Sequence, residues 1–188
     1  IFTSGTTGTP KGVMLSHRNI VSNIKATLAV LPIGREDRMM SFLPLSHIFE
    51  RTVTYIYMAA GSSIYYSGIS DLEQNLQDIK PHYFTVVPRV LEKMFEKIER
   101  HGRQLSGQQK KVFDWAIALG ENYELDVKKK LRYNIELKLA KKLVFSRLIK
   151  ALGVEVKGLV IGAAALQIRL AKIFSAAGVA ICEGYGLT

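Results

Sequence analysis

The sequence predicts an α/β fold in which helices cover both faces of an open, mostly parallel sheet. Short apolar runs of strand length alternate with segments whose apolar residues recur at helical spacing, and this alternation is typical of parallel sheets. The chain of 188 residues, 48% hydrophobic and 22% charged, is long enough for one sizeable core. Right-handed crossovers would bring the carboxyl ends of the strands to one edge of the sheet, where loops bind ligands.

The predicted elements are bounded by start and stop signals. Ser16 and Ser46 read as helix N-caps, Ser70 and Glu73 have the spacing of a capping box, and Gly61 ends a helix. The expected strands are 1–2, 13–15, 38–43, 62–67, 82–87, 156–161 and 179–182. The expected helices follow Ser16 to about residue 31, Ser46 to about residue 60 and Ser70 to about residue 79. Two more are expected over 89–100 and 166–177.

One stretch, about residues 108–151, departs from the alternation and predicts a helical basic insertion. Apolar residues recur in it at helical spacing: Leu131, Ile135, Leu139, Leu143 and Leu148. Basic residues surround them: Lys128, Lys129, Lys130, Arg132, Lys138, Lys141, Lys142, Arg147 and Lys150. One interpretation is a solvated face over a packed apolar stripe, and the other is a surface for an anionic membrane or partner. No recognised nucleic-acid-binding motif accompanies the charge, so we expect no nucleic acid.

The net charge and the cysteine count indicate which kinds of partner and which cellular compartment to expect. The net charge of +10 favours anionic partners, such as ATP, CoA, a fatty acid carboxylate or an acidic membrane surface. Cys182 is the only cysteine, which favours a reducing compartment, so we predict a cytoplasmic protein with peripheral contact at the inner membrane face as an option. No apolar run approaches the ~20 residues of a spanning helix, and the start lacks the features of a signal peptide. The absence of an initiator Met suggests a piece of a longer chain.

The segment from Thr3 to Gly12 (TSGTTGTPKG) has the composition of an anion-binding loop. It offers hydroxyls, glycines and Lys11, with no acidic or large apolar side chain. Its glycines permit the conformations that turn successive backbone N–H groups inward around an anion, and the lysine adds a positive charge. A flexible linker has a similar composition, but a preceding strand end and the Pro10–Gly12 ending favour a phosphate-binding loop.

This segment resembles the signature loop of the adenylate-forming superfamily, which includes acyl-CoA synthetases, luciferases and the adenylation domains of peptide synthetases. It differs from the GxxxxGK[ST] nucleotide loop because Pro10–Gly12 stands where that pattern requires Gly-Lys-Ser/Thr. The resemblance implies that ATP phosphates are bound by Thr3, Ser4, Gly5, Thr6, Thr7, Gly8 and Lys11.

The segment at residues 42–51 (FLPLSHIFER) stands where a strand passes into a helix. A histidine at such a point can be a simple capping or loop residue. The segment resembles the Pro-Leu-x-His region of acyl-CoA synthetases, and the string from His47 to Arg51 resembles the long-chain fatty acid branch. That resemblance implies that His47 lies beside the substrate carboxylate and that residues 87–89 lie near the acyl chain. Pro88 can equally be a strand terminator.

Two segments late in the chain resemble the adenine-binding region of the same family. Gly162, Ala163 and Ala164 are small enough for a flat ring to approach the backbone, although such runs also occur where a strand and a helix pack tightly. In the final segment, Glu183 and Gly184 precede Tyr185, whose ring can stack on adenine, and Gly186 and Thr188 follow it. The resemblance gives Thr188 a phosphate contact and places a Mg²⁺-binding glutamate directly after it, so no metal ligand is expected within the chain.

Together these motifs predict a single partial domain over residues 1–188, the ATP- and acyl-binding part of the large N-terminal domain of a long-chain acyl-CoA synthetase. The resemblance implies that a fatty acid carboxylate attacks the α-phosphorus of ATP to give an acyl-adenylate and pyrophosphate, and that CoA then displaces AMP. Lys11, His47 and Thr188 would serve this reaction. A C-terminal domain with a catalytic lysine is absent, so the isolated chain is expected to be inactive. The alternatives are a ligase of another carboxylic acid and a basic binding module.

Overall fold

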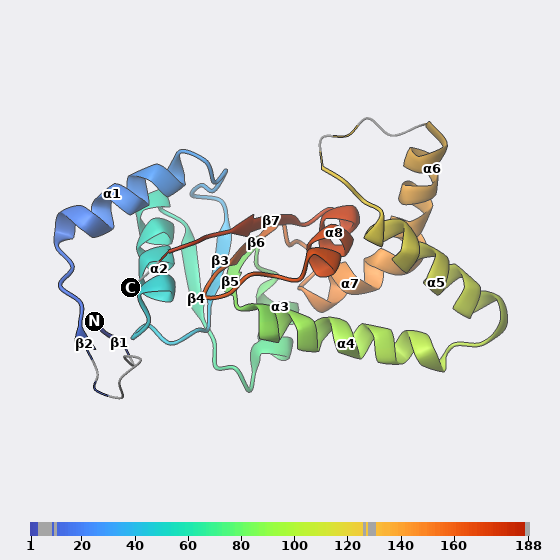
Figure 1. Cartoon of the computed structure of the whole chain (residues 1–188), viewed down its shortest axis with the longest axis horizontal. Helices are drawn as coiled ribbons and strands as arrows, with labels where there is room; N and C mark the ends of the chain where they lie inside the picture. The colour runs from blue at the N-terminus through green and yellow to red at the C-terminus, as the bar shows by residue number, and fades with distance from the viewer. Residues whose placement is uncertain (4–8, 10, 126, 128–130, 187–188) are drawn as a thin grey trace.

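The computed structural model describes residues 1–3, 9, 11–125, 127 and 131–186, and within them a parallel sheet is the central element (Figure 1). The five-stranded sheet in this described part has the order β4-β3-β5-β6-β7, and every neighbouring pair is parallel. Its strands are β3 (Arg38–Ser41), β4 (Ser63–Tyr66), β5 (Tyr83–Val86), β6 (Gly158–Ile161) and β7 (Ala180–Glu183). The predicted fold class is confirmed.

Helices connect these strands and cover both faces of the sheet. They are α1 (His17–Leu28), α2 (Ile48–Ala60), α3 (Leu72–Ile79), α4 (Pro88–Gln104), α5 (Gly107–Glu121), α6 (Leu131–Ala140), α7 (Ser146–Ala151) and α8 (Ile168–Ala177). A π-helical turn, η1 (Lys141–Phe145), joins α6 to α7. Two short antiparallel strands, β1 (Phe2–Thr3) and β2 (Lys11–Gly12), stand apart from the sheet.

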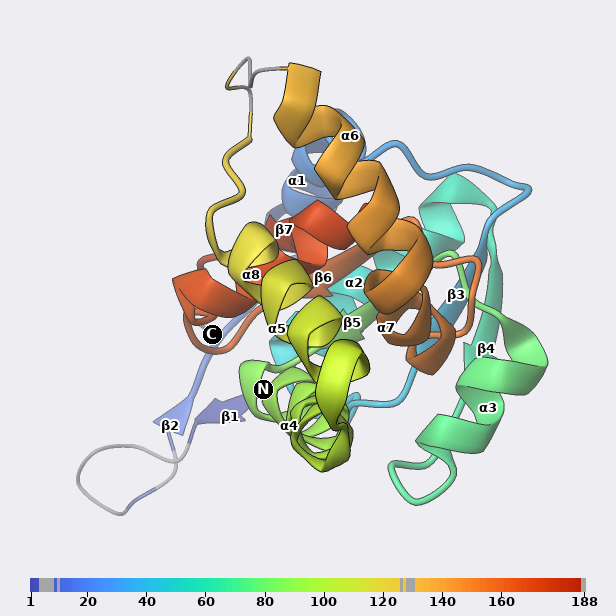
Figure 2. The same cartoon turned by 90° about the vertical axis from the view of Figure 1, so that its right-hand side faces the viewer.

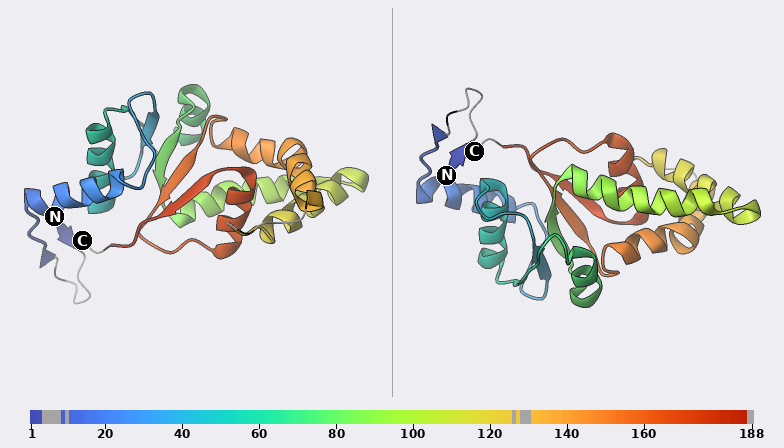
Figure 3. Two further views of the ribbon diagram at one scale, coloured as in Figure 1. Left: turned by 90° about the horizontal axis from the view of Figure 1, so that it is seen from above. Right: turned by 90° about the horizontal axis from the view of Figure 1, so that it is seen from below.

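The pleat of the central strands sends alternate side chains into two separate cores. Met40, Phe84 and Leu159 face a large core shared with α3, α4, α5, α7 and α8. Met39 and Tyr83 face a smaller core shared with α2. Figure 3 shows α1 and α2 on one side of the sheet and the larger helical group on the other. Successive residues of a strand point to opposite faces, so a strand buried on both faces reads as a continuous apolar run.

The helix starts follow the prediction in part. Ser16 caps α1, and its hydroxyl accepts the N–H of Asn19 at 3.2 Å. The predicted cap at Ser46 is wrong, because His47 has the extended backbone of an N-cap, with φ −84° and ψ 135°. The predicted capping box at Ser70 is also wrong, since its hydroxyl donates to the side chain of Asp71, which is the N-cap of α3.

The first strands also differ from the prediction. No strand forms at the expected position 13–15, and β2 covers residues 11–12 instead. The N–H of Val13 still donates to the carbonyl of Ile1 at 2.7 Å, so this residue extends the pairing of β1 with β2 by one bond.

The predicted basic insertion is a helical excursion between β5 and β6, and Figure 2 views the molecule from its end. Its predicted packed stripe is wrong for four of five residues: Leu131 is 76% exposed, Ile135 53%, Leu139 48% and Leu143 54%. Leu148 is buried as expected. The reason is that the excursion contains a second apolar series, and this series packs into or against the large core. It consists of Leu137, Ala140 and Val144, and Leu148 packs there with it.

Candidate functional site

The two predicted adenine segments leave the sheet side by side, because β6 and β7 are parallel neighbours and each segment follows one of them. The N–H of Gly184 donates to the carbonyl of Ile161 at 2.8 Å, which extends the ladder past the strand ends. The carboxylate of Glu183 accepts the N–H of Leu166 at 2.8 Å and so joins β7 to the start of the α8 segment. Ala163 has a φ of +68°, a left-handed conformation that costs a residue with a side chain ~1–2 kcal/mol.

Phe49 brings the His47 segment to the same place. A β-carbon added at Gly162 would lie 2.4 Å from the Phe49 ring, and one added at Gly184 would lie 4.0 Å from it. Glycine at position 162 therefore leaves room for the ring, which would have to shift if the residue carried a side chain. The predictions gave Phe49 no role. A large aromatic residue in one motif and a glycine in another were the only signals of this contact.

His47 begins α2 at this edge of the sheet. Its N–H donates to the carbonyl of Pro44 at 3.0 Å, and its own carbonyl accepts the N–H of Arg51 at 3.2 Å. The guanidinium of Arg51 also donates to the carbonyl of Leu45 at 2.8 Å, which fixes the turn before the helix. The His47 ring makes no capping bond and is exposed. The backbone is thus held on both sides of an imidazole that remains accessible.

Part of the predicted phosphate loop is described. Thr3 lies opposite Lys11 in the β1–β2 pair, and Lys11 is exposed. Figures 1 and 3 show that the chain leaving β7 runs towards the end of the molecule where this pair lies. The predicted site residues Ser4, Gly5, Thr6, Thr7, Gly8 and Thr188 lie outside the described residues.

The end of the site that carries Tyr185 is open. Its side chain is 97% exposed, and a β-carbon added at Gly186 would meet no atom within 4 Å in the described structure. The ring expected to stack on adenine is therefore available to a ligand.

A buried acid lies beneath this edge. Glu50, in the first turn of α2, is fully buried and accepts a hydrogen bond from the hydroxyl of Ser41 at the end of β3. Its other carboxyl oxygen has no hydrogen-bond partner among the described residues. Burial raises the pKa of Glu50, and the hydrogen bond from Ser41 only partly offsets that effect. Tyr57 and Thr85 share a hydrogen bond of 3.2 Å in the same interior, and burial raises the pKa of the Tyr57 phenol as well.

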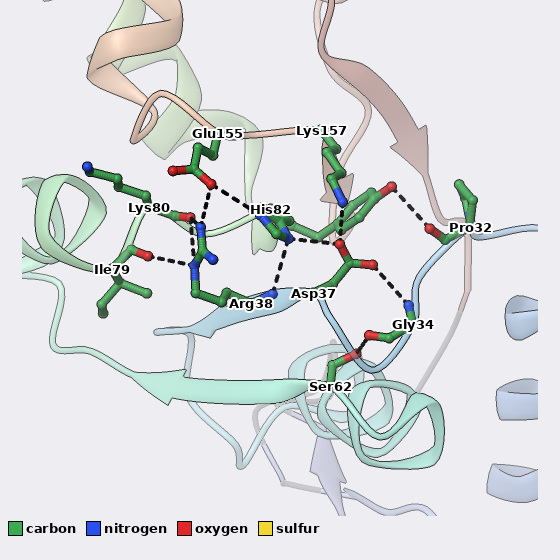
Figure 4. Close-up of polar contacts among 11 residues, drawn as sticks. Pro32, Gly34, Asp37, Arg38, Ser62, Ile79, Lys80, His82, Glu155 and Lys157 are labelled. Carbon is green, nitrogen blue, oxygen red and sulfur yellow. Dashed lines mark hydrogen bonds and ion pairs between the residues drawn. The ribbon is translucent and has the colours of Figure 1, made fainter.

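The opposite edge of the sheet holds a polar network that joins the amino ends of the central strands (Figure 4). Asp37, which is buried, accepts hydrogen bonds from Lys157 at 2.6 Å, from Nδ1 of His82 at 2.8 Å and from the N–H of Gly34 at 2.9 Å. Burial alone would raise the pKa of Asp37, but the bonds from these three donors outweigh burial and lower it.

The network extends to a second acid. Nε2 of His82 lies 3.4 Å from Glu155, which also accepts a hydrogen bond from Arg38 at 2.6 Å. The hydrogen bonds from Arg38 and His82 lower the pKa of Glu155. Sequence reasoning missed this network because its members lie far apart in the chain. Its place at the amino ends of the strands, away from the candidate site, marks it as a structural clamp.

Within the described residues, no group of three or more His, Cys, Asp or Glu side chains is placed to hold a metal ion. The same residues contain no helix with the length and apolarity needed to cross a bilayer.

Comparison with known sequences identifies relatives along the whole chain. Residues 1–188 match the profile of a family described as AMP-binding enzyme. The chain is 37% identical over 194 residues to long-chain-fatty-acid–CoA ligase 5 of Rattus norvegicus, covering 100% of this chain and 27% of that protein. It is 34% identical over 199 residues to long chain acyl-CoA synthetase 4 of Arabidopsis thaliana, covering 100% of this chain and 29% of that protein. The chain thus spans less than a third of the length of these curated relatives.

Solved structures agree on the fold. The adenylation domain of a carboxylate reductase from Mycobacterium chelonae superposes with a TM-score of 0.70 at 25% identity, covering 100% of this chain and 26% of that chain. The N-terminal domain of FACL13 from Mycobacterium tuberculosis, bound to an inhibitor, has a TM-score of 0.62 at 20% identity and covers 99% of this chain and 35% of that chain.

Proposed function

This chain belongs to the AMP-binding enzyme family, and from that membership we propose that the full-length protein is an AMP-forming ligase of long-chain fatty acids and CoA. Curated relatives named as long-chain-fatty-acid–CoA ligases support the substrate class. We propose that residues 1–188 form part of one large N-terminal domain. Because the C-terminal lysine would lie outside it, these residues alone would not turn over ATP.

The observation that carries the proposal is the meeting of three sequence motifs at one edge of the sheet. The ring of Phe49, two residues after His47, lies against Gly162, and the N–H of Gly184 donates to the carbonyl of Ile161 at the end of β6. In open parallel sheets this edge is the usual place for a nucleotide. We propose that the small residues 162–164 border the adenine and that Tyr185 stacks on it.

Lys11 would supply the charge that the reaction requires. Transfer at the α-phosphorus depends on positioning and charge neutralisation more than on covalent catalysis. Hydroxyls and N–H groups of residues 3–8 would bind the β- and γ-phosphates, and Lys11 would offset their negative charge. Mg²⁺ would neutralise further phosphate charge when bound.

His47 would act at the carboxylate of the fatty acid. Its ring is exposed at the start of α2, where the backbone is fixed by Pro44 and Arg51. The carboxylate oxygen would form the new bond to the α-phosphorus while the bond to the leaving pyrophosphate breaks. The thiol of CoA would then attack the acyl carbon and release AMP. An imidazole N–H beside the carboxylate would orient it for the first step.

The test is the Lys11→Ala variant of the full-length enzyme. A hydrogen bond to a charged group contributes ~1.5–3 kcal/mol, so the KM for ATP should rise about tenfold or more. The measurement is pyrophosphate release at varied ATP and fixed fatty acid. Lys25→Ala, which removes an exposed lysine from α1, is the matched control and should behave as the wild type. Equal ATP dependence in the Lys11 variant and the wild type would refute the phosphate-loop assignment.

A ligase of another carboxylic acid is the second candidate. The structural similarity to an adenylation domain of a carboxylate reductase favours keeping it. A panel of short-chain, aromatic and long-chain acids separates the two, because preference for an acid without a long alkyl chain would replace the first candidate with the second.

A further inference from the structure

Helix α6 and η1 present apolar residues on two sides, and only one side is covered. Leu137, Ala140 and Val144 pack into or against the large core, and the Tyr133 hydroxyl donates to the carbonyl of Leu119 in α5 at 3.2 Å. The other series is spaced by four residues and is uncovered. We call it the outer stripe: Leu131, Ile135, Leu139 and Leu143, each about half exposed or more. Four large apolar side chains in one row are unusual on a water-facing helix. Exposed apolar patches of this kind mark surfaces that contact another molecule.

The outer stripe lies in a strongly basic surrounding. The exposed basic side chains from residue 131 to residue 150 are Arg132, Lys138, Lys141, Lys142, Arg147 and Lys150. Glu136 is the one acid in this range of the sequence, and it is already paired with Arg132 at 2.8 Å. Lys138 and Lys142 directly precede two leucines of the stripe. The surface therefore joins exposed apolar residues to an uncompensated positive charge.

We propose that α6 and η1 form a docking surface for an anionic lipid bilayer, with the outer stripe entering the boundary of the acyl chains and the lysines contacting the headgroups. An apolar row flanked by lysines is the pattern of helices that lie in the plane of a membrane interface. A covering segment of protein would need an acidic face to match these charges. A second copy of the chain would bring its own positive charge to the contact.

The position of the surface sets how the protein would face the membrane. Figures 1 and 3 show α6 at the opposite end of the molecule from β1 and β2. Docking through α6 therefore leaves the proposed nucleotide site directed to the aqueous side. This inference does not depend on the proposed catalytic function.

The test is co-sedimentation of the full-length protein with vesicles of phosphatidylcholine, with and without an equal part of phosphatidylglycerol. Binding should require phosphatidylglycerol and weaken as salt is raised. The Lys138→Gln/Lys142→Gln variant should bind about thirtyfold more weakly, since each lysine contributes ~1 kcal/mol near an anionic surface. The Leu139→Ser/Leu143→Ser variant should lose on the order of a hundredfold in affinity. The matched control is Val21→Ser/Val30→Ser, which removes two other exposed apolar residues and should bind as the wild type.

The urea midpoint of the Leu139→Ser/Leu143→Ser variant shows whether the outer stripe is exposed or covered by protein in the full-length chain. An outer stripe exposed in the full-length protein predicts an unchanged urea midpoint for Leu139→Ser/Leu143→Ser. A lowered midpoint together with no vesicle binding by the wild type would show that protein covers the stripe, and the proposal would be wrong. Equal binding to vesicles without phosphatidylglycerol, or full binding by the leucine variant, would also overturn it.

Discussion

The clamp at the amino ends of the strands makes a specific prediction for the Asp37→Asn variant. The carboxylate of Asp37 binds three donors at once, from the loop before β3, from the residue before β5 and from the segment before β6. Asparagine has the same shape but is neutral, and it presents an N–H₂ group to one of these donors. The substitution therefore removes the charge and leaves a partly buried donor without an acceptor.

The magnitude follows from the burial of the two partners. Removing one member of a buried ion pair costs ~3–5 kcal/mol, whereas an exposed pair contributes below ~1 kcal/mol. Asp37 is buried, but the side chain of Lys157 is 52% exposed and can be solvated again. We therefore expect a loss of about 2–3 kcal/mol in the free energy of unfolding at neutral pH.

The stability that Asp37 contributes should fall as the pH is lowered. Asp37 has a lowered pKa in the folded state, so its contribution is fully present above the unfolded carboxyl pKa of about 3.9 and is lost as the pH falls through the folded value. The difference between wild type and variant should therefore shrink below about pH 4.

Urea unfolding followed by circular dichroism over a pH series measures this difference. Asp78→Asn is the matched control, because Asp78 is exposed and bonded only to Gln74 among the described residues, and it should shift the free energy by less than about 0.5 kcal/mol. If Asp37→Asn is as stable as this control at neutral pH, the clamp does not stabilise the sheet.

Three further predictions test other parts of the structure. Gly162→Ala should cost ~1–3 kcal/mol of stability because the added methyl group meets the ring of Phe49, and a urea midpoint equal to the wild type would contradict that contact. Leu148→Ala should cost ~2–5 kcal/mol while Leu139→Ala changes stability by less than about 0.5 kcal/mol, and the reverse order in thermal unfolding would mean that the two apolar series are wrongly assigned. Glu50 has a raised pKa, so the folded state loses stability relative to the unfolded state as the pH rises above the ordinary carboxyl value of about 4.3. Glu50→Gln should remove this decline, and parallel pH profiles of stability for the two proteins would disprove it.

Local sequence signals were sufficient for the order of the five strands of the parallel sheet and of α2, α3, α4 and α8 between them. Continuous apolar runs bounded by proline or glycine predicted the strands β3 and β5, because such runs are what burial on both faces requires. Gly61 was predicted to end a helix and does so with a φ of +73°. The predicted N-cap of α2 was wrong by one residue. Ser46 has the side chain preferred at this position, but the path of the backbone places His47 there.

Contacts between distant residues were beyond such signals. The spacing of leucines predicted an apolar face on α6, yet which of two faces meets the core depends on how α5 lies beside it. The ring of Phe49 and the backbone of Gly162 meet only because β3 and β6 end at the same edge of the sheet. The Asp37 network likewise requires the strand order to be known first. The motifs themselves were read from sequence, and their roles in binding stay predictions.

The strand order also determines when neighbouring strands can pair during translation. β5 pairs with β6 only after the whole excursion from α4 to α7 has been made, and this is the widest gap in sequence between neighbours in the described sheet. At ~5–20 residues per second, the edge of β5 that later pairs with β6 stays unpaired on the ribosome for several seconds. The excursion consists mainly of helices, whose contacts are local and form quickly, so it can fold during this wait and cover the apolar face of β5 until β6 has been made. We therefore expect variants that destabilise α4 or α5 to lower the yield of folded protein more than their effect on equilibrium stability would suggest.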